Sequence, residues 1–374
     1  MIHRGSHGGA LVLRQIIRVI SLANACPGRE KLREKVVRES MVTSKESQPE
    51  VRWGVLSTAN IGVKALIPAI RAARNARLVA VASRDLERAA AVAQLERGAL
   101  AYGDYQALLD DPNVDAVYIP LPNSMHYEWA IKAAEAGKHV LCEKPLGLTA
   151  VEVEDMFAAS ERAGVLLMEA FMYRFHPQIA WTLAQVEAGR IGELRVIRSS
   201  FGFDLRRDPD NIRLKGALGG GSLMDVGCYP LSLSRVFFGA PPVAAAAMMV
   251  EPAGSEVEMG VQATLDFGGE RRAVIDSGFA HYWGQSAELV GDQGRIVIPR
   301  PFTPGSGETL VRIETQAEII ERRFEPVDHY VLQVEAFGDA IQNGGPAPLD
   351  RADALAQARA IELIYTSANY RWPR

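Results

Sequence analysis

One lysine stands where this sequence is best placed to do chemistry. Lys144 follows an apolar run, residues 140–142, with Glu143 before it and Pro145 after it. Open α/β sheets bind their ligands at the carboxyl ends of buried strands, and a lysine there is costly to desolvate unless it is paired or in use. We therefore predict a catalytic role for Lys144. The alternative is an ordinary surface pair with Glu143.

A second pair of candidates follows three consecutive glycines, residues 219–221. Asp225 and Tyr229 are four residues apart, so they share one face of a helix that we expect to begin near Ser222. A phenol can exchange its proton directly with a substrate oxygen, which makes Tyr229 the predicted proton donor and acceptor. Lys144 would bond the same oxygen or Tyr229, and would lower the pKa of the phenol. A half-buried tyrosine bonded to backbone is the alternative.

Other side chains complete the predicted substrate site. Asp225 would orient the substrate hydroxyls or Lys144, and Arg174 and His176 are candidates for substrate contact or for support of the residues that make it. The predicted substrate-binding set is Lys144, Arg174, His176, Asp225 and Tyr229. The spacing of His, Cys and Asp suggests no metal site, and the chemistry requires none.

The elements that must position these residues begin with a strand, a turn and a helix. Residues 51–56 are apolar, residues 57–62 form the turn, and the helix that follows is amphipathic. In a dinucleotide fingerprint, the backbone N–H groups of such a turn and the helix dipole hold a pyrophosphate. Its three glycine positions hold Ser57, Ala59 and Gly62 here, so a plain turn is the alternative. The predicted cofactor contacts in the turn are Ser57, Thr58, Ala59, Asn60, Ile61 and Gly62.

The end of the next strand, residues 77–82, indicates which dinucleotide is bound. An NAD enzyme usually places Asp or Glu there, to bond the ribose hydroxyls, whereas this chain has Ser83 and Arg84. A hydroxyl and a guanidinium suit a 2′-phosphate better. We therefore predict NADP. NAD stays possible, because Asp85 could serve it by turning inward.

Helices and strands then alternate in the first half, which predicts a parallel, doubly wound sheet of the Rossmann type. A helix is expected over residues 85–97, a strand over 115–119 and a helix over 124–136. The cofactor should lie across the carboxyl edge of this sheet. The further cofactor contacts predicted there are Leu121, Pro122, Asn123, His126, Glu143 and Lys144.

The second half has successive strands with short connections, which predicts an α+β domain built on a large, mainly antiparallel sheet. Strands are expected over residues 194–203, 242–251, 257–267, 271–280, 286–290, 295–298, 309–314 and 319–324, and closing helices over 330–342 and 352–367. The loop at 204–221 carries Arg206, Arg207, Arg213 and Lys215. It is either solvated or a basic segment over the cofactor phosphates or the substrate.

Composition limits the other possibilities. The 374 residues suit two domains better than one, and we place their boundary between residues 51–172 and 173–374. A formal charge of −4 without a basic block argues against nucleic acid, and no later stretch is apolar for long enough to span a membrane. The three cysteines are widely spaced, which favours a reducing compartment, so we expect a cytoplasmic protein.

Residues 1–50 differ from the rest. Residues 1–27 contain three arginines and no acidic residue, and the arginines interrupt the apolar run that a secretory signal requires. An Arg-rich presequence is an alternative. We expect an N-terminal extension that is disordered or reflects an upstream start, with the authentic start near Met41.

Five blocks of sequence, in order, resemble the glucose–fructose oxidoreductase / inositol dehydrogenase (Gfo/Idh/MocA) family. They are residues 53–59, the Asn123-x-x-His126 loop, Glu143-Lys144-Pro145, residues 169–177 and residues 219–229. The second and last blocks resemble the subgroup with D-xylose dehydrogenase, trans-dihydrodiol dehydrogenase, sugar 3-ketoreductases and glucose–fructose oxidoreductase. The resemblance implies that Tyr229 takes the role of a histidine found in inositol dehydrogenase relatives. It also implies a homodimer or homotetramer through the open face of the second sheet.

These observations predict an NADP-dependent oxidoreductase that acts on a CH–OH group or carbonyl of a sugar or polyol. A non-catalytic NADP-binding regulator is the alternative from another class, because the galactose-regulon repressors of yeast resemble the same family. Trans-dihydrodiol oxidation and NAD-assisted glycoside cleavage are alternatives among enzymes. The substrate, the carbon and the direction of the reaction stay open.

Overall fold

The computed structural model describes residues 50–305 and 307–371. The described residues from 51 to 371 form one compact unit, so the predicted boundary near residue 172 stays a prediction. The predicted extension lies outside the described residues apart from Glu50. Among the residues described, no helix has the length and apolar character to cross a membrane.

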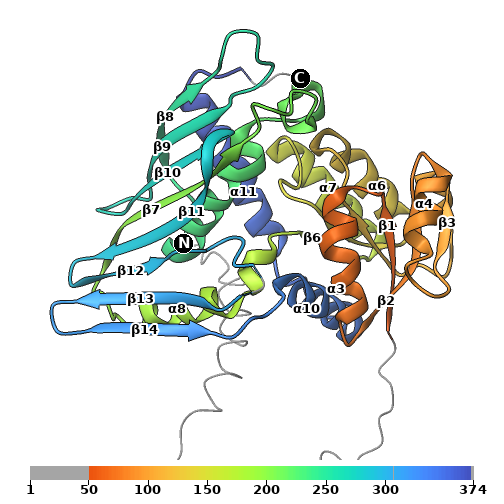
Figure 1. Cartoon of the computed structure of the whole chain (residues 1–374), viewed down its shortest axis with the longest axis horizontal. Coiled ribbons are helices and arrows are strands. Elements are labelled where there is room, and N and C mark those ends of the chain that lie inside the picture. Colours follow the sequence, from red (N-terminus) through yellow and green to blue (C-terminus); the bar gives the residue numbers. More distant parts are fainter. Residues whose placement is uncertain (1–49, 306, 372–374) are drawn as a thin grey trace, which may run out of the picture. The chain divides into compact units, whose positions relative to one another are not determined.

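A six-stranded parallel sheet forms the first half (Figure 1). Its strands are β1 (Val51–Leu56), β2 (Ala76–Ala82), β3 (Leu100–Tyr102), β4 (Ala116–Ile119), β5 (His139–Cys142) and β6 (Leu167–Glu169). Their spatial order is β3-β2-β1-β4-β5-β6, so the order reverses between β1 and β4. Ligands bind at such a reversal, beyond the carboxyl ends of the strands.

Helices alternate with these strands, as the sequence predicts. They are α3 (Ile67–Ala72), α4 (Leu86–Ala93), α5 (Tyr105–Leu109), α6 (His126–Glu135) and α7 (Ala150–Ala163). A π-helical turn, Gly62–Leu66, precedes α3. The strands are apolar because helices shield both faces of a parallel sheet, and Trp53 and Tyr118 are fully buried there.

An eight-stranded, mainly antiparallel sheet forms the second half. Its order is β14-β13-β12-β11-β7-β10-β9-β8, and within the described part of this sheet only β7 and β10 pair in parallel. The strands are β7 (Leu194–Asp204), β8 (Ala244–Val250), β9 (Gly260–Asp266), β10 (Arg272–Gly278), β11 (Ala280–Gly291), β12 (Gly294–Ile298), β13 (Thr309–Thr315) and β14 (Ile319–Phe324). The predicted fold class, a Rossmann sheet with an α+β second half, is confirmed.

The helices of the second half are α8 (Pro177–Glu187), α9 (Cys228–Phe238), α10 (His329–Asn343) and α11 (Arg351–Ser367). The closing helix α10 packs on β1 and α3 of the first half. There, the rings of Phe337 and Trp53 lie 6.0 Å apart, and the amide of Asn75 donates to Asp339. The end of the chain thereby joins the two sheets into one unit.

Candidate active site

A π-helical turn, Leu223–Gly227, carries one side of the site and leads directly into α9. Glu258 fixes its start, because its carboxylate accepts from the N–H of Leu223 at 2.7 Å. Gly221 has φ +112°, and a Cβ there would lie 2.3 Å from Glu258. Only glycine fits this approach. Such turns are frequent at functional sites, and the helix start predicted near Ser222 is where the structure has it.

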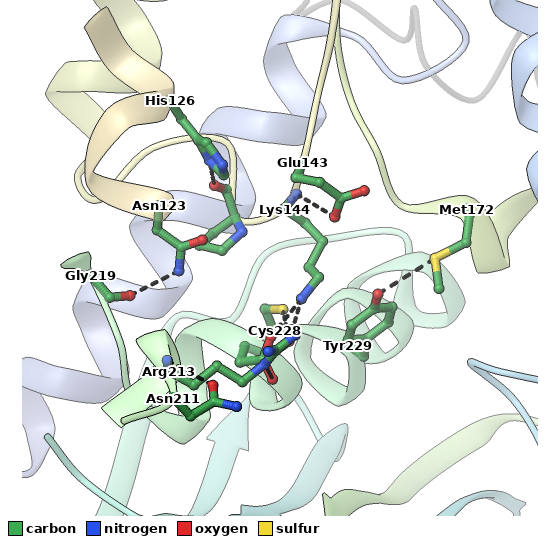
Figure 2. A network of polar contacts seen from close by, with 12 residues as sticks. Asn123, His126, Glu143, Lys144, Met172, Asn211, Arg213, Gly219, Cys228 and Tyr229 are labelled. Atoms are coloured by element: carbon green, nitrogen blue, oxygen red, sulfur yellow. Dashed lines mark hydrogen bonds and ion pairs between the residues drawn. The ribbon is translucent and has the colours of Figure 1, made fainter. Parts of the chain in front are cut away.

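Lys144 reaches this turn from the end of β5 (Figure 2). Its Nζ donates to the backbone oxygen of Asp225 at 2.7 Å and to Asp225 Oδ1 at 3.1 Å. The second carboxylate oxygen, Oδ2, accepts from Arg213 Nε at 2.7 Å. One partly buried carboxylate therefore joins two cations that come from different parts of the chain.

Lys144, Asp225 and Arg213 form a triad in which each charge favours the ionised form of its neighbour. Burial acts to lower the pKa of Lys144, but the charge of Asp225 outweighs it and the pKa lies above its ordinary value. Burial acts to raise the pKa of Asp225, but Lys144 and Arg213 together bring it below the ordinary value. All three groups are charged at neutral pH.

Tyr229 lies beside the triad and is 5% exposed. Lys144 Nζ sits 5.1 Å from the centre of its ring, and its hydroxyl donates to Met172 Sδ at 3.5 Å. Burial raises the pKa of Tyr229 well above its ordinary value. This corrects the prediction that Lys144 lowers this pKa: the ammonium faces the ring and bonds Asp225, whereas the phenol hydroxyl bonds Met172, so desolvation governs the pKa.

Glu143 is anchored on the opposite side of Lys144. Its Oε1 accepts from the Tyr118 hydroxyl at 2.6 Å, and its Oε2 from the backbone N–H of Lys144 at 3.3 Å. Burial raises its pKa, against the opposing charge of Lys144. These bonds exclude the surface pair that was the alternative for Glu143 and Lys144.

A cavity of about 590 Å³ unites these groups, a size typical of ligand sites. The predicted site residues that line it are Ala59, Asn60, Ile61, Leu121, Pro122, Asn123, Glu143, Lys144, Asp225 and Tyr229. The cavity is also lined by residues that were not predicted as site residues: Pro120, Met172, Phe201, Phe203, Asp208, Asp210, Asn211, Ile212, Leu218, Gly219, Gly220, Val226, Thr303 and Tyr330. Arg213 also lines it, and was flagged only as part of the basic loop.

The predicted site residues that do not line this cavity are Ser57, Thr58, Gly62, Ser83, Arg84, His126, Arg174 and His176. His126 is fully buried, with its ring nitrogens 2.9 Å from the carbonyl oxygens of Leu121 and Pro145. Burial lowers its pKa to about 4. It therefore ties together two loops that do line the cavity.

Arg174 and His176 are occupied elsewhere. Arg174 pairs with Asp353 of α11. His176 is 1% exposed and caps α8 by accepting from the N–H of Gln178. Neither side chain lines the cavity, so their predicted substrate contact has no support in the geometry.

The turn predicted to bind the dinucleotide leads from the end of β1 into the π-helical turn before α3. A Cβ on Gly62 would lie 3.4 Å from Pro120 and 3.6 Å from Val55, which are ordinary van der Waals distances, so space alone does not require glycine there. Ser57 has φ 131°, a region that favours glycine, and its Oγ accepts from the N–H of Ala59 at 3.0 Å. The positive φ of Ser57 is thus the feature that this turn shares with a glycine-rich dinucleotide turn, and it fits the predicted pyrophosphate site.

At the end of β2, the structure gives each side chain a distinct place. Asp85 caps α4, accepting from the N–H groups of Glu87 and Arg88 at 3.0 and 3.2 Å. Ser83 is buried and Arg84 is exposed. The carboxylate of Asp85 is thus engaged by the helix. Within the residues described, no group of three or more His, Cys, Asp or Glu side chains could hold a metal ion.

Two family models and several known proteins match this sequence. Residues 51–171 match the model of the Gfo/Idh/MocA oxidoreductase family with an NAD-binding Rossmann fold, and residues 182–297 match its C-terminal domain. The chain is 40% identical over 319 residues to D-xylose 1-dehydrogenase (NADP(+)) 2 of Haloferax volcanii, covering 84% of this chain and 97% of the relative. It is 34% identical over 256 residues to trans-1,2-dihydrobenzene-1,2-diol dehydrogenase of Xenopus tropicalis, covering 66% and 75%.

Among solved structures, a 3-ketoreductase from Actinomadura kijaniata in complex with NADP and TDP-benzene is similar, with a TM-score of 0.81 and 33% identity. The match covers 85% of this chain and 98% of that one. The same enzyme is also known as variants in which one tyrosine is replaced by phenylalanine, or one lysine by alanine.

Proposed function

This chain belongs to the Gfo/Idh/MocA oxidoreductase family, and from that premise we propose that it is an NADP-dependent oxidoreductase of a sugar or polyol, with Tyr229 and Lys144 as its catalytic residues. The observation that carries the proposal is their geometry. Lys144 lies over the Tyr229 ring in a cavity that the dinucleotide turn also lines.

The cofactor would be held at the carboxyl edge of the parallel sheet. The N–H groups of the turn from Ser57 to Gly62 would bond its pyrophosphate. Arg84 and Ser83 would meet the 2′-phosphate, because Asp85 is engaged in capping α4 and a cation suits that phosphate. When bound, the nicotinamide supplies or accepts the hydride.

The protein's own task is to move one proton and stabilise one oxygen. The hydroxyl of Tyr229 donates its proton to the substrate oxygen in reduction and receives it back in oxidation. Its raised pKa keeps it protonated, hence ready to donate, at neutral pH. Two of the three N–H donors of Lys144 bond Asp225. The third can bond the substrate oxygen and stabilise the negative charge that develops there.

A non-catalytic NADP-binding regulator remains the alternative from another class. Retention of a lysine, a tyrosine and a carboxylate around one cavity favours catalysis. Dihydrodiol oxidation is the alternative among enzymes, supported by the 34% identical relative. A cytoplasmic location and assembly through the second sheet complete the proposal.

The test begins with equilibrium binding of NADPH and NADH to the full chain, which is measured by nicotinamide fluorescence. D-xylose, other aldoses, ketosugars and a dihydrodiol are then supplied with the matching cofactor. We expect NADPH or NADP to bind at least tenfold more tightly than the NAD forms, and a sugar to be turned over. Tighter binding of NADH would refute the cofactor assignment. Tight binding with no turnover of any substrate would favour the regulator.

Lys144→Ala separates catalysis from binding in the same assay. We expect turnover to fall by about 100-fold or more, because removing a donor to a developing oxyanion has that effect. NADPH affinity should change less than about threefold. Equal losses in turnover and affinity would contradict the assigned role.

A further inference from the structure

Arg213 lies on the basic loop and, like Lys144, binds the side chain of Asp225 (Figure 2 labels the two cations). Its guanidinium donates to Oδ2 of Asp225, while Lys144 donates to Oδ1. It also lines the cavity, with its side chain 41% exposed. The simplest structural explanation is that the ion pair between Arg213 and Asp225 holds the loop against the turn Leu223–Gly227.

The backbone of Arg213 is fixed independently of that ion pair. Its N–H donates to Asn211 Oδ1 at 3.1 Å, and its carbonyl oxygen accepts from the N–H of Gly221 at 2.8 Å. Gly220 packs against the same carbonyl so closely that a Cβ there would lie 2.3 Å from it. The loop would therefore keep its path without the guanidinium, which leaves the charge of Arg213 for another purpose.

That purpose follows from how a carboxylate is shared. Asp225 binds Lys144 twice, through its backbone oxygen and its side chain. If Lys144 were its only cation, the full charge of Asp225 would act on the ammonium alone and hold it away from the substrate. A second cation at Oδ2 offsets part of the negative charge of Asp225, so the attraction between Asp225 and Lys144 is weaker. Lys144 then stays oriented by Asp225 and is still able to bond a substrate oxygen.

We infer that Arg213 is a positioning residue for the proposed reaction: it balances Asp225 and so sets how firmly that carboxylate holds Lys144. The inference rests on the proposed function for its effect on turnover, but not for its effect on charge. The titratable and charged groups that act on Asp225 come from three parts of the fold. They are Glu143 and Lys144 after β5, Arg213 on the loop, and Cys228 and Tyr229 on α9.

The experiment compares Arg213→Gln and Arg213→Lys in the full chain with Arg206→Gln as the matched control. Arg206 is on the same loop and pairs with Asp204, exposed and outside the cavity lining. The pH dependence of kcat is measured for each. In Arg213→Gln the acid limb, which reports protonation of Asp225, should move up by about one pH unit, because an adjacent opposite charge shifts a carboxyl pKa by at least that much. Its kcat should fall about tenfold, while Arg213→Lys restores most of both.

A second readout does not depend on turnover. The side-chain carboxyl carbon of Asp225 is titrated by NMR in ¹³C-aspartate-labelled protein with NADP bound, and its signal is assigned with Asp225→Asn. Its pKa should rise in Arg213→Gln and not in Arg206→Gln. A shifted carboxyl in a protein that turns over no substrate would sustain the inference on charge and sink the proposed function.

The opposite pattern would overturn the inference. An unmoved Asp225 pKa in Arg213→Gln, or a loss of kcat with the pH profile in place, would show that Arg213 only closes the loop. An equal effect of Arg206→Gln would lead to the same conclusion.

Discussion

Tyr229 combines a rigid ring with a hydroxyl at the edge of the cavity. Four aromatic rings, those of Phe171, Tyr173, Phe201 and Phe302, lie 5.4 to 5.9 Å from its own. Two of these contacts, with Phe171 and Phe201, are edge-to-face and two are tilted, and together they hold the ring in one orientation. The hydroxyl is therefore presented to the substrate by packing, with a weak bond to Met172 as its partner in the absence of substrate.

Tyr229→Phe should leave that packing intact and remove only the proton. We expect kcat to fall by about 10²- to 10⁴-fold, the usual contribution of a positioned acid or base, with NADPH affinity within about threefold. Tyr173→Phe is the matched control, since that hydroxyl bonds Ser232 and does not line the cavity. Comparable losses in the two variants, measured by steady-state kinetics, would point to packing instead of proton transfer.

The pKa shifts predict an unusually broad pH range for reduction. A proton donor is active below its pKa, and that of Tyr229 is raised above 10.0. Asp225 is active when ionised, and its pKa is lowered below 3.8. Hence kcat for reduction should stay level from about pH 5 to pH 9. An alkaline loss of kcat centred near pH 7 to 8 would mean that Lys144 does lower the tyrosine pKa once ligands bind.

Ser57 shows the cost of a serine where the fingerprint has glycine. At φ 131°, a side chain strains the backbone by about 1–3 kcal/mol. Glycine at an ordinary position is less stable than alanine by about 0.5–1 kcal/mol, but here the order should reverse. Ser57→Gly should be more stable than Ser57→Ala by about 1 kcal/mol, because both lack the hydroxyl and only alanine carries the strain. Denaturant unfolding measures the difference, and the ordinary order would contradict this account.

The elements were more predictable than the contacts between them. Apolar runs and glycine turns located β5 and the helix that begins after Ser222, so Lys144 and the Asp225–Tyr229 pair could be named from the sequence. The edge of the parallel sheet predicted the place of Lys144 only. Its convergence with Asp225 and Tyr229, which belong to the second half, was predicted from the chemistry that they would share. Arg213 could not be paired with Asp225, because the path of an irregular loop depends on close glycine contacts that no periodicity reveals.

Other misses have the same origin. A histidine in a first helical turn can face a ligand or the interior, and only the carbonyl oxygens around His126 decide which. Tyr330 belongs to a closing helix with an ordinary apolar pattern, yet it lines the cavity because α10 returns to the first sheet. The sign of the Tyr229 pKa shift depended on which part of the ring Lys144 faces. The sequence alone does not predict the path by which α10 returns to the first sheet, or the part of the Tyr229 ring that Lys144 faces.

The loop between β7 and α9 also determines the charge of the cavity. Among the described residues that line it, Lys144 and Arg213 are the cations, and both bind Asp225. Asp208 and Asp210 line it as well. Together with Asp225 and Glu143, they give the lining more acidic than basic side chains, so it should disfavour a phosphate or carboxylate on the substrate.

A neutral sugar should therefore have a kcat/KM at least about tenfold higher than its phosphate ester, and the ratio should shrink as salt screens the acids. The double variant Asp208→Asn, Asp210→Asn should narrow the ratio several-fold without raising kcat for the neutral sugar. Initial rates with matched pairs of sugar and sugar phosphate measure this. A preference for the phosphate in the unaltered protein would refute the charge argument.

At the scale of the molecule, the larger sheet has one face toward its helices and one without them (Figure 1). The second face mixes ion pairs, such as Arg198 with Glu288 and Arg295 with Glu314, with exposed apolar side chains. Val274 is central to it and 44% exposed. Charged ladders with apolar residues between them can pair with a second copy of themselves, since each copy offers both signs.

We predict that this face joins two or four copies of the chain. Val274→Glu would bury an unpaired charge at the contact, a strongly destabilising change, and should weaken self-association by at least about tenfold while monomer folding is unchanged by circular dichroism. Val151→Glu is the matched control, because Val151 is 69% exposed on α7, away from the larger sheet. Light scattering across a dilution series gives the masses. A monomer at micromolar concentration, or equal dissociation of the two variants, would contradict this prediction. The charged and apolar side chains of the open face would then be exposed to solvent and not form a contact between copies.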